Sequence, residues 1–322
     1  MAQFALYNYQ FFELPLSEIR DKGQLYGAGA EPEVMAFKDS FPKRQEIFGK
    51  LLSEDFESGA QIIKFKGERQ TGYGHLHVMK PTDDIIILKV INKHSVALHD
   101  KKLRGRREED YRACVVVIDN RPGIQRIAIE RNRAAFTELK QVEKILTYTF
   151  SRILRSYCMR LELENLHSAN DFWQYVNNTE RYPGGFWKLR ITLPPLNLER
   201  LTHVHENITK RFRESFQTGM TIEFSERGSA VHLSEDDELQ KETIRWLTEE
   251  VGGNTTMLYP RGKGQKAIVV GEESYRYVDM AMPIFDTLKE ASLNQQMFAN
   301  SDALDTVKIT MKMNIQDSLS TQ

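Results

Sequence analysis

Apolar and polar residues alternate along much of the first 131 residues, which predicts a series of short strands. Residues 1–14 are rich in aromatic side chains, including Phe4, Tyr9 and Phe11, as is typical of a strand. Further strands are predicted over residues 61–66, 74–79, 84–91, 113–119 and 125–131. The turn Pro122-Gly123 separates the last two, because proline presets one dihedral and glycine supplies the left-handed position. We expect a mostly antiparallel β-meander.

A different period follows over residues 134–157, where apolar residues recur at spacings of three and four. The positions are Leu139, Val142, Leu146, Phe150, Ile153 and Tyr157. This spacing predicts a long amphipathic helix that packs on the meander. A strand over 159–164 comes next, and then a short aromatic helix and a turn within residues 169–182. Pro183-Gly184-Gly185 then marks the expected boundary between an antiparallel β-rich α+β domain, 1–183, and a second domain, 184–322.

The second half reads as two β-α-β units in series. The expected elements are strand 186–193, helix 198–216, strand 220–225, strand 230–233, helix 236–251 and strand 255–259. This order is that of a ferredoxin-like βαββαβ domain, so the fold class is α+β. A C-terminal extension follows, with a hairpin of 267–270 and 275–280, a helix at 283–292 and a strand over 306–313.

Composition narrows the classes of function. The chain has 322 residues, a formal net charge of −1, and two cysteines, Cys114 and Cys158, in segments that predict burial. No segment predicts a signal peptide or a membrane span, so we expect a cytoplasmic protein without a membrane partner. Because a protein that coats nucleic acid non-specifically usually carries net positive charge, any such contact must come from local patches.

The densest basic patch is "KKLRGRREED", in which five cations precede Glu108, Glu109 and Asp110. We expect a strand-to-strand loop that turns at Gly105, and the three acids could neutralise it locally. A second patch lies in the glycine-rich segment 259–266. The residues expected to contact nucleic acid are Lys101, Lys102, Arg104, Arg106, Arg107, Arg131, Arg133, Arg152, Arg155, Arg261 and Lys263.

Candidate chemistry is sparse. Asp119 and Glu130 fall on neighbouring strands, as in a metal-dependent nuclease, but Asn132 stands where such sites carry a lysine. Glu162 and Glu164 would add a second carboxylate pair. Paired histidines on one strand, His75 and His77, lack a third ligand, so we expect no metal site and no cofactor.

Recognition of RNA by a four-stranded sheet is the other possibility that the predicted fold raises. Strand 230–233 lacks the aromatic signature of the common RNA-binding module. Trp187 could stack a base, yet it shares a predicted strand face with Leu189 and Ile191, which favours the core.

Three hypotheses follow. The first is a non-enzymatic binding or assembly component of a larger complex that contacts nucleic acid through basic loops. The second is a metal-dependent nuclease that uses acids of the N-terminal sheet. The third is a protein–protein adaptor or homo-oligomeric scaffold, for which a prokaryotic phage-defence system is one setting.

Overall fold

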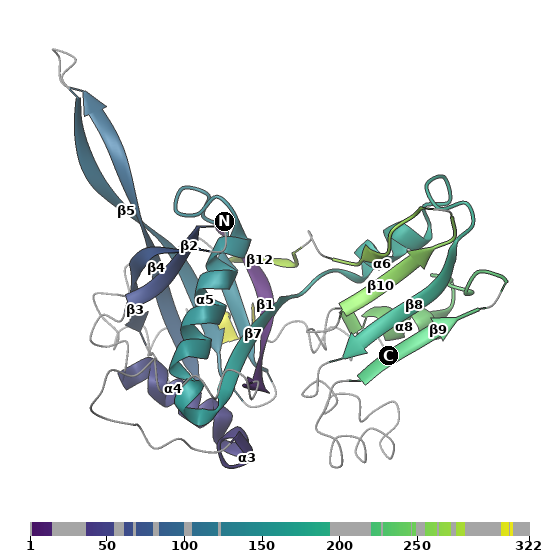
Figure 1. Cartoon of the computed structure of the whole chain (residues 1–322), viewed down its shortest axis with the longest axis horizontal. Helices are drawn as coiled ribbons and strands as arrows, with labels where there is room; N and C mark the ends of the chain where they lie inside the picture. Colours follow the sequence, from purple (N-terminus) through teal and green to yellow (C-terminus); the bar gives the residue numbers. More distant parts are fainter. Residues whose placement is uncertain are drawn as a thin grey trace. The chain divides into compact units, whose positions relative to one another are not determined.

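The structure is a computed structural model of the chain, and Figure 1 shows how its elements are arranged. It describes residues 2–14, 37–54, 61–66, 69–79, 84–99, 105–121, 124–193, 220–226, 228–245, 247–248, 255–262, 264–271, 275–280, 304–308 and 310–311. Over these ranges the protein is of the α+β class with antiparallel sheets, as the sequence predicts. None of the described helices combines the length and apolar character that a membrane span requires.

Two compact units make up the chain, and each combines separate stretches of sequence. Unit 1 contains Met1–Ala5, Tyr9–Leu163 and Tyr277–Met313. Unit 2 contains Leu6–Asn8, Glu164–Arg276 and Asn314–Gln322. Compactness alone does not show that a unit folds independently, so the division into domains 1–183 and 184–322 stays a prediction.

The larger sheet runs mainly through unit 1 and has eight strands among the described residues. Their order is β12-β1-β6-β5-β4-β3-β2, and β7 pairs with β1. The strands are β1 (Ala2–Glu13), β2 (Gln61–Lys66), β3 (Arg69–Met79), β4 (Ile85–His99), β5 (Gly105–Asp119), β6 (Arg126–Glu130), β7 (Met159–Asn165) and β12 (Tyr277–Met280). Each pair from β2 to β6 is antiparallel, which confirms the predicted meander.

The helix α5 (Leu139–Ile153) crosses one face of this sheet in Figure 1. Its buried residues are Val142, Ile145, Leu146, Thr149 and Phe150. Phe150 packs edge-on against Phe48 of α4 (Arg44–Glu54), with ring centroids 5.1 Å apart. The predicted apolar stripe therefore forms the core that holds the helix on the sheet. Shorter helical segments are α3 (Phe37–Ser40), η1 (Phe41–Lys43) and η2 (Arg155–Tyr157).

Both cysteines are buried and free, as expected for small apolar residues. The Cys114 thiol donates to the Glu130 backbone carbonyl oxygen at 3.1 Å. Burial, and secondarily the Glu130 carboxylate, raise the pKa of this thiol well above its usual value. Cys114 is therefore a core residue and not a nucleophile.

The hairpin of β4 and β5 continues far beyond the rest of the sheet (Figure 1). β3 pairs with β4 only as far as Val90, and β6 pairs with β5 only as far as Val116. The two strands go on pairing with each other out to His99↔Gly105. We call residues 91–99 and 105–113 the ribbon. At about 3.3 Å per residue it extends for about 26 Å.

The ribbon corrects one expectation from the sequence. Gly105 is the first residue of β5 and does not form the turn, and the acidic run that follows it lies in a strand. The connection is confined to residues 100–104, where Lys101, Lys102 and Arg104 lie outside the described residues. The charged stretch looked like a loop because it contains no apolar alternation, whereas its strand conformation comes from pairing with β4.

The C-terminal extension also differs from its prediction. Residues 304–308 and 310–311 are helical, and the buried Leu304, Val307 and Met311 follow helical spacing. The predicted strand over 306–313 is therefore wrong. Arg126, which is fully buried, donates to the Met311 carbonyl oxygen at 2.8 Å and so fixes this segment on the sheet. The helix expected at 283–292 lies outside the described residues.

Unit 2 contains a four-stranded antiparallel sheet in the order β11-β10-β8-β9. Its strands are β8 (Phe186–Leu193), β9 (Met220–Ser225), β10 (Thr255–Pro260) and β11 (Ile268–Val269). Two helices, α6 (Ala169–Val176) and α8 (Glu238–Arg245), bury Phe172 and Ile244 against Leu189, Ile191 and Leu258. The covered face is the inner face of this sheet, and the opposite one is its outer face.

The antiparallel pairing of β8 with β10 is compatible with the ferredoxin-like arrangement, which stays a prediction because residues 194–219 lie outside the description. Two details differ from it. Residues 230–233 form no strand, and β9 pairs directly with β8. The predicted hairpin of 267–270 with 275–280 is wrong as well, because β11 pairs with β10 whereas β12 pairs with β1.

Candidate nucleic-acid interface

The ribbon places its charged residues on two opposite faces. Successive residues of a strand point to opposite sides, so Arg106 lies on the face of Glu108, and Arg107 on the other. An ion pair joins Arg106 to Glu108 at 3.0 Å. Among the described residues, Arg107 has no acidic partner. The basic residues of this segment therefore do not form one continuous patch, and the acids neutralise part of them.

A network of three side chains lies on the Arg107 face. The Tyr111 hydroxyl donates to Glu109 at 2.5 Å, Lys93 forms an ion pair with the same carboxylate, and the Lys93 ammonium lies 5.9 Å from the Tyr111 ring centroid. The hydrogen bond from Lys93 lowers the pKa of Glu109. The same hydrogen bond raises the pKa of Lys93. The Lys93 ammonium offsets the negative charge of Glu109, which therefore repels an incoming anion less.

A second basic group lies at the base of the ribbon. Arg112 donates to the Ala134 carbonyl oxygen at 3.3 Å, and Asn132 donates to that of Ala113 at 2.9 Å. The loop with Arg131 and Arg133 thus packs beside the ribbon, and both arginines are exposed. The Arg131 guanidinium also lies over the Tyr277 ring, 5.3 Å from its centroid.

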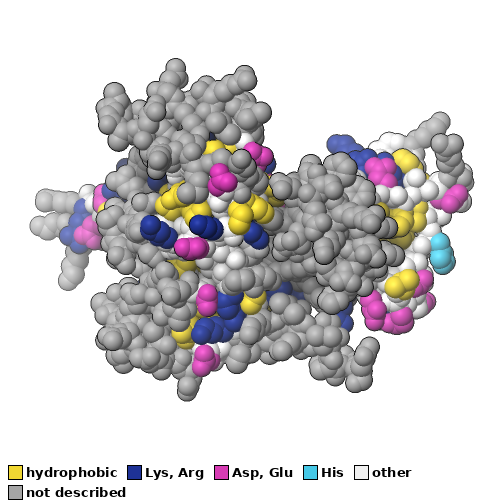
Figure 2. Space-filling model, turned by 90° about the horizontal axis from the view of Figure 1, so that it is seen from below, with side chains coloured by type: hydrophobic (Ala, Val, Ile, Leu, Met, Phe, Trp, Pro, Cys, Tyr) yellow, Lys and Arg dark blue, Asp and Glu magenta, His cyan; other side chains and the backbone are white. Residues whose placement is uncertain are grey.

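The basic end of α5 does not join this group. Arg152 lies in the last turn of α5 and Arg155 in η2, whereas the helix begins at Leu139, a few residues after Arg133. A helix of 15 residues spans about 22 Å, which separates Arg152 from the base of the ribbon. Figure 2, which views the molecule from below, shows several places where basic and acidic side chains of the described residues lie next to one another.

The acids of the nuclease hypothesis are not brought together. The Glu130 carboxylate accepts a hydrogen bond from the Val115 backbone N–H at 2.9 Å, and Asp119 lies four residues further along β5. At about 3.3 Å per residue the two carboxylates are about 13 Å apart, far more than a shared magnesium ion allows. Asp119 is instead fully buried and accepts two hydrogen bonds from Arg121.

The second carboxylate pair is also engaged elsewhere. Glu162 forms an ion pair with Arg160 at 2.9 Å, and Glu164 lies two residues further on the same face of β7. Among the residues that the structure describes, no three His, Cys, Asp or Glu side chains gather as a metal site would require. The geometry of these acids therefore supports a structural role for them.

Trp187 is the residue that sequence reasoning placed wrongly. Between Lys188↔Tyr259 and Phe186↔Pro260 the register of β8 and β10 shifts, which leaves Trp187 without a partner in β10. Such a β-bulge re-aims a side chain. Phe186 consequently fills the core at 2% exposure, while Trp187 is 41% exposed. The only sign of this in the sequence is that Phe186 and Trp187 are adjacent aromatic residues, so either of them could fill the core.

Aromatic and basic side chains alternate beside this tryptophan on the outer face. The Trp187 and Tyr259 ring centroids are 5.8 Å apart, and the Lys188 ammonium lies 4.9 and 4.3 Å from them, respectively. The Arg190 guanidinium lies over the Tyr259 ring, 5.6 Å from its centroid, and forms an ion pair with Glu223. Both cations are thus held in place over rings, as in surfaces that stack bases.

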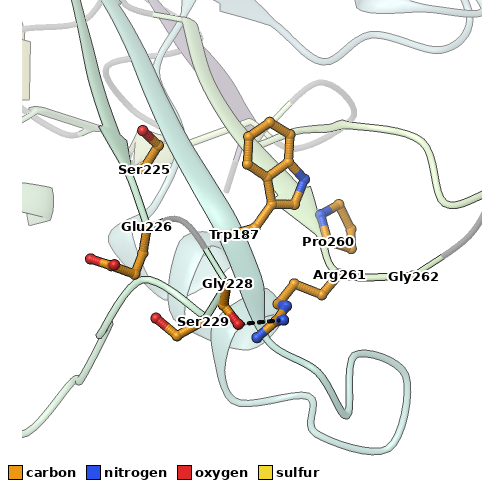
Figure 3. Close-up of a pocket in the computed structure, with 8 residues that line it drawn as sticks. All are labelled: Trp187, Ser225, Glu226, Gly228, Ser229, Pro260, Arg261 and Gly262. Carbon is orange, nitrogen blue, oxygen red and sulfur yellow. Dashed lines mark hydrogen bonds between the residues drawn. The ribbon is translucent and has the colours of Figure 1, made fainter.

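An open hollow of about 670 Å³ adjoins the exposed indole, as Figure 3 shows. Its lining consists of Trp187, Ser225, Glu226, Gly228, Ser229, Pro260, Arg261 and Gly262. Arg261 donates to the Gly228 carbonyl oxygen at 2.9 Å, which fixes the guanidinium at the hollow. Of the two cations predicted in the glycine-rich segment, Arg261 belongs to this site, and Lys263 lies outside the described residues.

The local backbone explains how Arg261 reaches this position. The Arg261 backbone N–H donates to the Gly185 carbonyl oxygen at 2.9 Å. A Cβ atom at Gly184 would lie 3.1 Å from the Arg261 Cβ and 3.2 Å from its carbonyl oxygen, closer than side chains normally pack. The absence of side chains in Pro183-Gly184-Gly185, expected as a domain boundary, therefore permits this close approach.

Comparison with known proteins finds no family model and no curated protein that matches the chain.

Proposed function

We propose that the protein is a non-enzymatic component that binds single-stranded nucleic acid on the outer face of the unit 2 sheet. The observation that carries this proposal is the β-bulge, which turns Trp187 out of the core and beside Lys188, Tyr259 and Arg261. An exposed aromatic ring among cations is the arrangement with which proteins stack bases and hold a phosphate backbone. Among the residues that the structure describes on this surface, no catalytic group is assembled.

A single strand fits this face better than a duplex does. Stacking on an indole needs the flat side of an unpaired base, whereas a duplex exposes only base edges and phosphates. Burying one base against an aromatic residue contributes about 1–3 kcal/mol. Because the protein's formal net charge is −1, this non-ionic contribution has to supply much of the affinity.

The test is the affinity of the full chain for a labelled single-stranded oligonucleotide, measured by fluorescence anisotropy at low salt. We expect Trp187→Ala to weaken binding about 10-fold, since it removes one stacking surface. A duplex of the same sequence should compete poorly. Both RNA and DNA strands belong in the assay, because the surface shows no group that is specific for a 2′-hydroxyl.

Tyr148→Ala is the matched control, because Tyr148 is 40% exposed on α5 of unit 1 and so has nearly the exposure of Trp187. It should leave affinity unchanged. The unfolding midpoint of each variant shows that the chain remains folded. Equal affinity of the parent protein and Trp187→Ala, or no binding by the parent at low salt, would contradict the proposal.

A further inference from the structure

We infer that the hollow beside Trp187 is a subsite for one nucleotide, in which the base stacks on the indole and its phosphate contacts Arg261. This inference rests on the proposed function and assigns separate parts of one nucleotide to two residues. The hollow measures about 670 Å³, within the range of about 300–1,000 Å³ that small-molecule sites occupy. It is open to solvent, so a strand can enter and leave the subsite at either side of the bound nucleotide.

The exposed Trp187 indole forms the base-binding part, and Pro260, itself buried, also lines the hollow. Trp187 comes from the start of β8 and Pro260 from the end of β10, and Figure 3 shows their rings beside one another at the hollow. Lys188 and Tyr259 contact the indole from the outer face of the sheet, which restricts its rotation. A restrained ring loses little conformational entropy when a base stacks on it.

The phosphate-binding part is the Arg261 guanidinium. A guanidinium carries five N–H donors, and the structure uses one nitrogen of Arg261 to bind the Gly228 carbonyl oxygen. The remaining donors keep their fork geometry and the full positive charge, which suits a phosphate. Among the residues that the structure describes, no carboxylate forms an ion pair with Arg261, and a carbonyl anchor does not neutralise its charge.

The other lining groups fit the same ligand. Ser225 and Ser229 bring hydroxyl groups, and Gly228 has no side chain to block its backbone. A Cβ atom on Gly228 would meet nothing within 4 Å, so the space in front of this turn is open. Glu226 is the one acid of the lining, and in Figure 3 its carboxylate points away from Trp187, so it leaves the base-binding part free.

The experiment uses adenosine monophosphate, adenosine and ribose 5-phosphate as probes of the full chain, with binding measured by calorimetry. Adenosine monophosphate should bind about 10-fold more tightly than adenosine, because a charge-assisted hydrogen bond adds roughly that factor. Ribose 5-phosphate should bind most weakly, since it has no base. The intrinsic fluorescence should be quenched by both adenine probes and not by ribose 5-phosphate.

Variants separate the two parts. Arg261→Gln should lower the affinity for adenosine monophosphate to that for adenosine and leave adenosine binding unchanged. Trp187→Ala should weaken both. Lys241→Gln is the matched control and should change neither, because Lys241 is an exposed cation on α8, which covers the inner face of the sheet. Arg261→Lys is a second test, because it keeps the charge but loses the fork that holds Gly228 and a phosphate together.

The outcomes distinguish this inference from the proposed function. One outcome overturns the phosphate assignment alone: oligonucleotide binding depends on Trp187, but the affinity for the mononucleotide is unchanged by Arg261→Gln and by Arg261→Lys. If the affinity for the mononucleotide is unchanged by Trp187→Ala as well, the nucleotide binds elsewhere and the subsite is overturned. If neither oligonucleotide nor mononucleotide binds the parent protein, the proposed function fails together with the subsite.

Discussion

Asp119 shows how one residue type can serve two opposite roles. On sequence it is a candidate catalytic acid, yet its carboxylate is fully buried and accepts hydrogen bonds from the Arg121 guanidinium at 2.9 and 2.5 Å. The pair raises the pKa of Arg121, with the hydrogen bond to Asp119 as the main cause. Arg121 also donates to the Lys308 carbonyl oxygen at 3.3 Å, which ties the helical C-terminal segment to the sheet.

Removal of this carboxylate tests the structural role. Asp119→Ala leaves the partly buried Arg121 guanidinium without its anion, and loss of a hydrogen bond between charged groups costs about 1.5–3 kcal/mol. The measurement is the free energy of unfolding from urea titration. Asp119→Ala combined with Arg121→Ala should cost less than Asp119→Ala alone, because no unpaired charge remains buried. If Asp119→Ala has the same free energy of unfolding as the parent protein, the structural role of Asp119 is contradicted.

Single residues also mark the limit of what the sequence could predict. The alternation of Trp187, Leu189 and Ile191 predicted a shared inner face, and two of the three are buried there. The bulge that turns Trp187 outward depends on how many residues β10 offers opposite β8, and no pattern within β8 contains that information. The candidate site therefore became visible only through pairing between strands.

At the scale of elements, strands and helices with a buried face could be predicted closely. Strands β2, β8 and β9 begin and end at the predicted residues. In β8 the alternation follows from burial of one face, since Leu189 and Ile191 lie in the core. Residues 306–313 show the converse, since Val307 and Met311 are four apart and fit both periods. The burial of Leu304 together with Val307 and Met311 distinguishes the two, because these three positions share one face only in a helix.

The charged strand of the ribbon had no such signal, because its conformation comes from backbone pairing with β4 and not from an alternating apolar face of its own. Its Lys93–Glu109 contact gives a pH-dependent prediction. The hydrogen bond from Lys93 depresses the pKa of Glu109, so the contact contributes stability above the unfolded pKa of a glutamate, and this contribution is lost as pH falls through the folded value.

Carbon-detected NMR of the Glu109 carboxyl group measures this effect. In the parent protein the carboxyl should titrate at a lower pH than an ordinary glutamate, and Lys93→Ala should move the midpoint upward. Because Lys93 and Glu109 are both exposed, global stability should change little. Arg106→Ala is the control, since its acidic partner is Glu108 on the opposite face. An unshifted midpoint in Lys93→Ala would mean that the contact does not persist in solution.

For the whole molecule, near-neutral charge makes the salt dependence of binding the sharpest measure of how the basic clusters contribute. Affinity for a single strand falls with salt by about 0.7 logarithmic units per decade for each phosphate contact. Trp187→Ala removes no charge, so it should weaken binding without changing this slope. A variant that lacks the ribbon cations should weaken binding and also flatten this slope, if that cluster contacts the strand as the sequence predicts.

The decisive variant replaces Lys101, Lys102, Arg104, Arg106 and Arg107 with Ser, and we expect it to bind more weakly and with a flatter salt dependence. Single substitutions sharpen the test, because Arg106 is paired with Glu108 whereas Arg107 has no acidic partner among the described residues. Arg107→Ser should therefore reduce the slope by about 0.7, and Arg106→Ser by less. An unchanged slope in the fivefold variant would confine binding to unit 2 and leave the ribbon as a solvated hairpin.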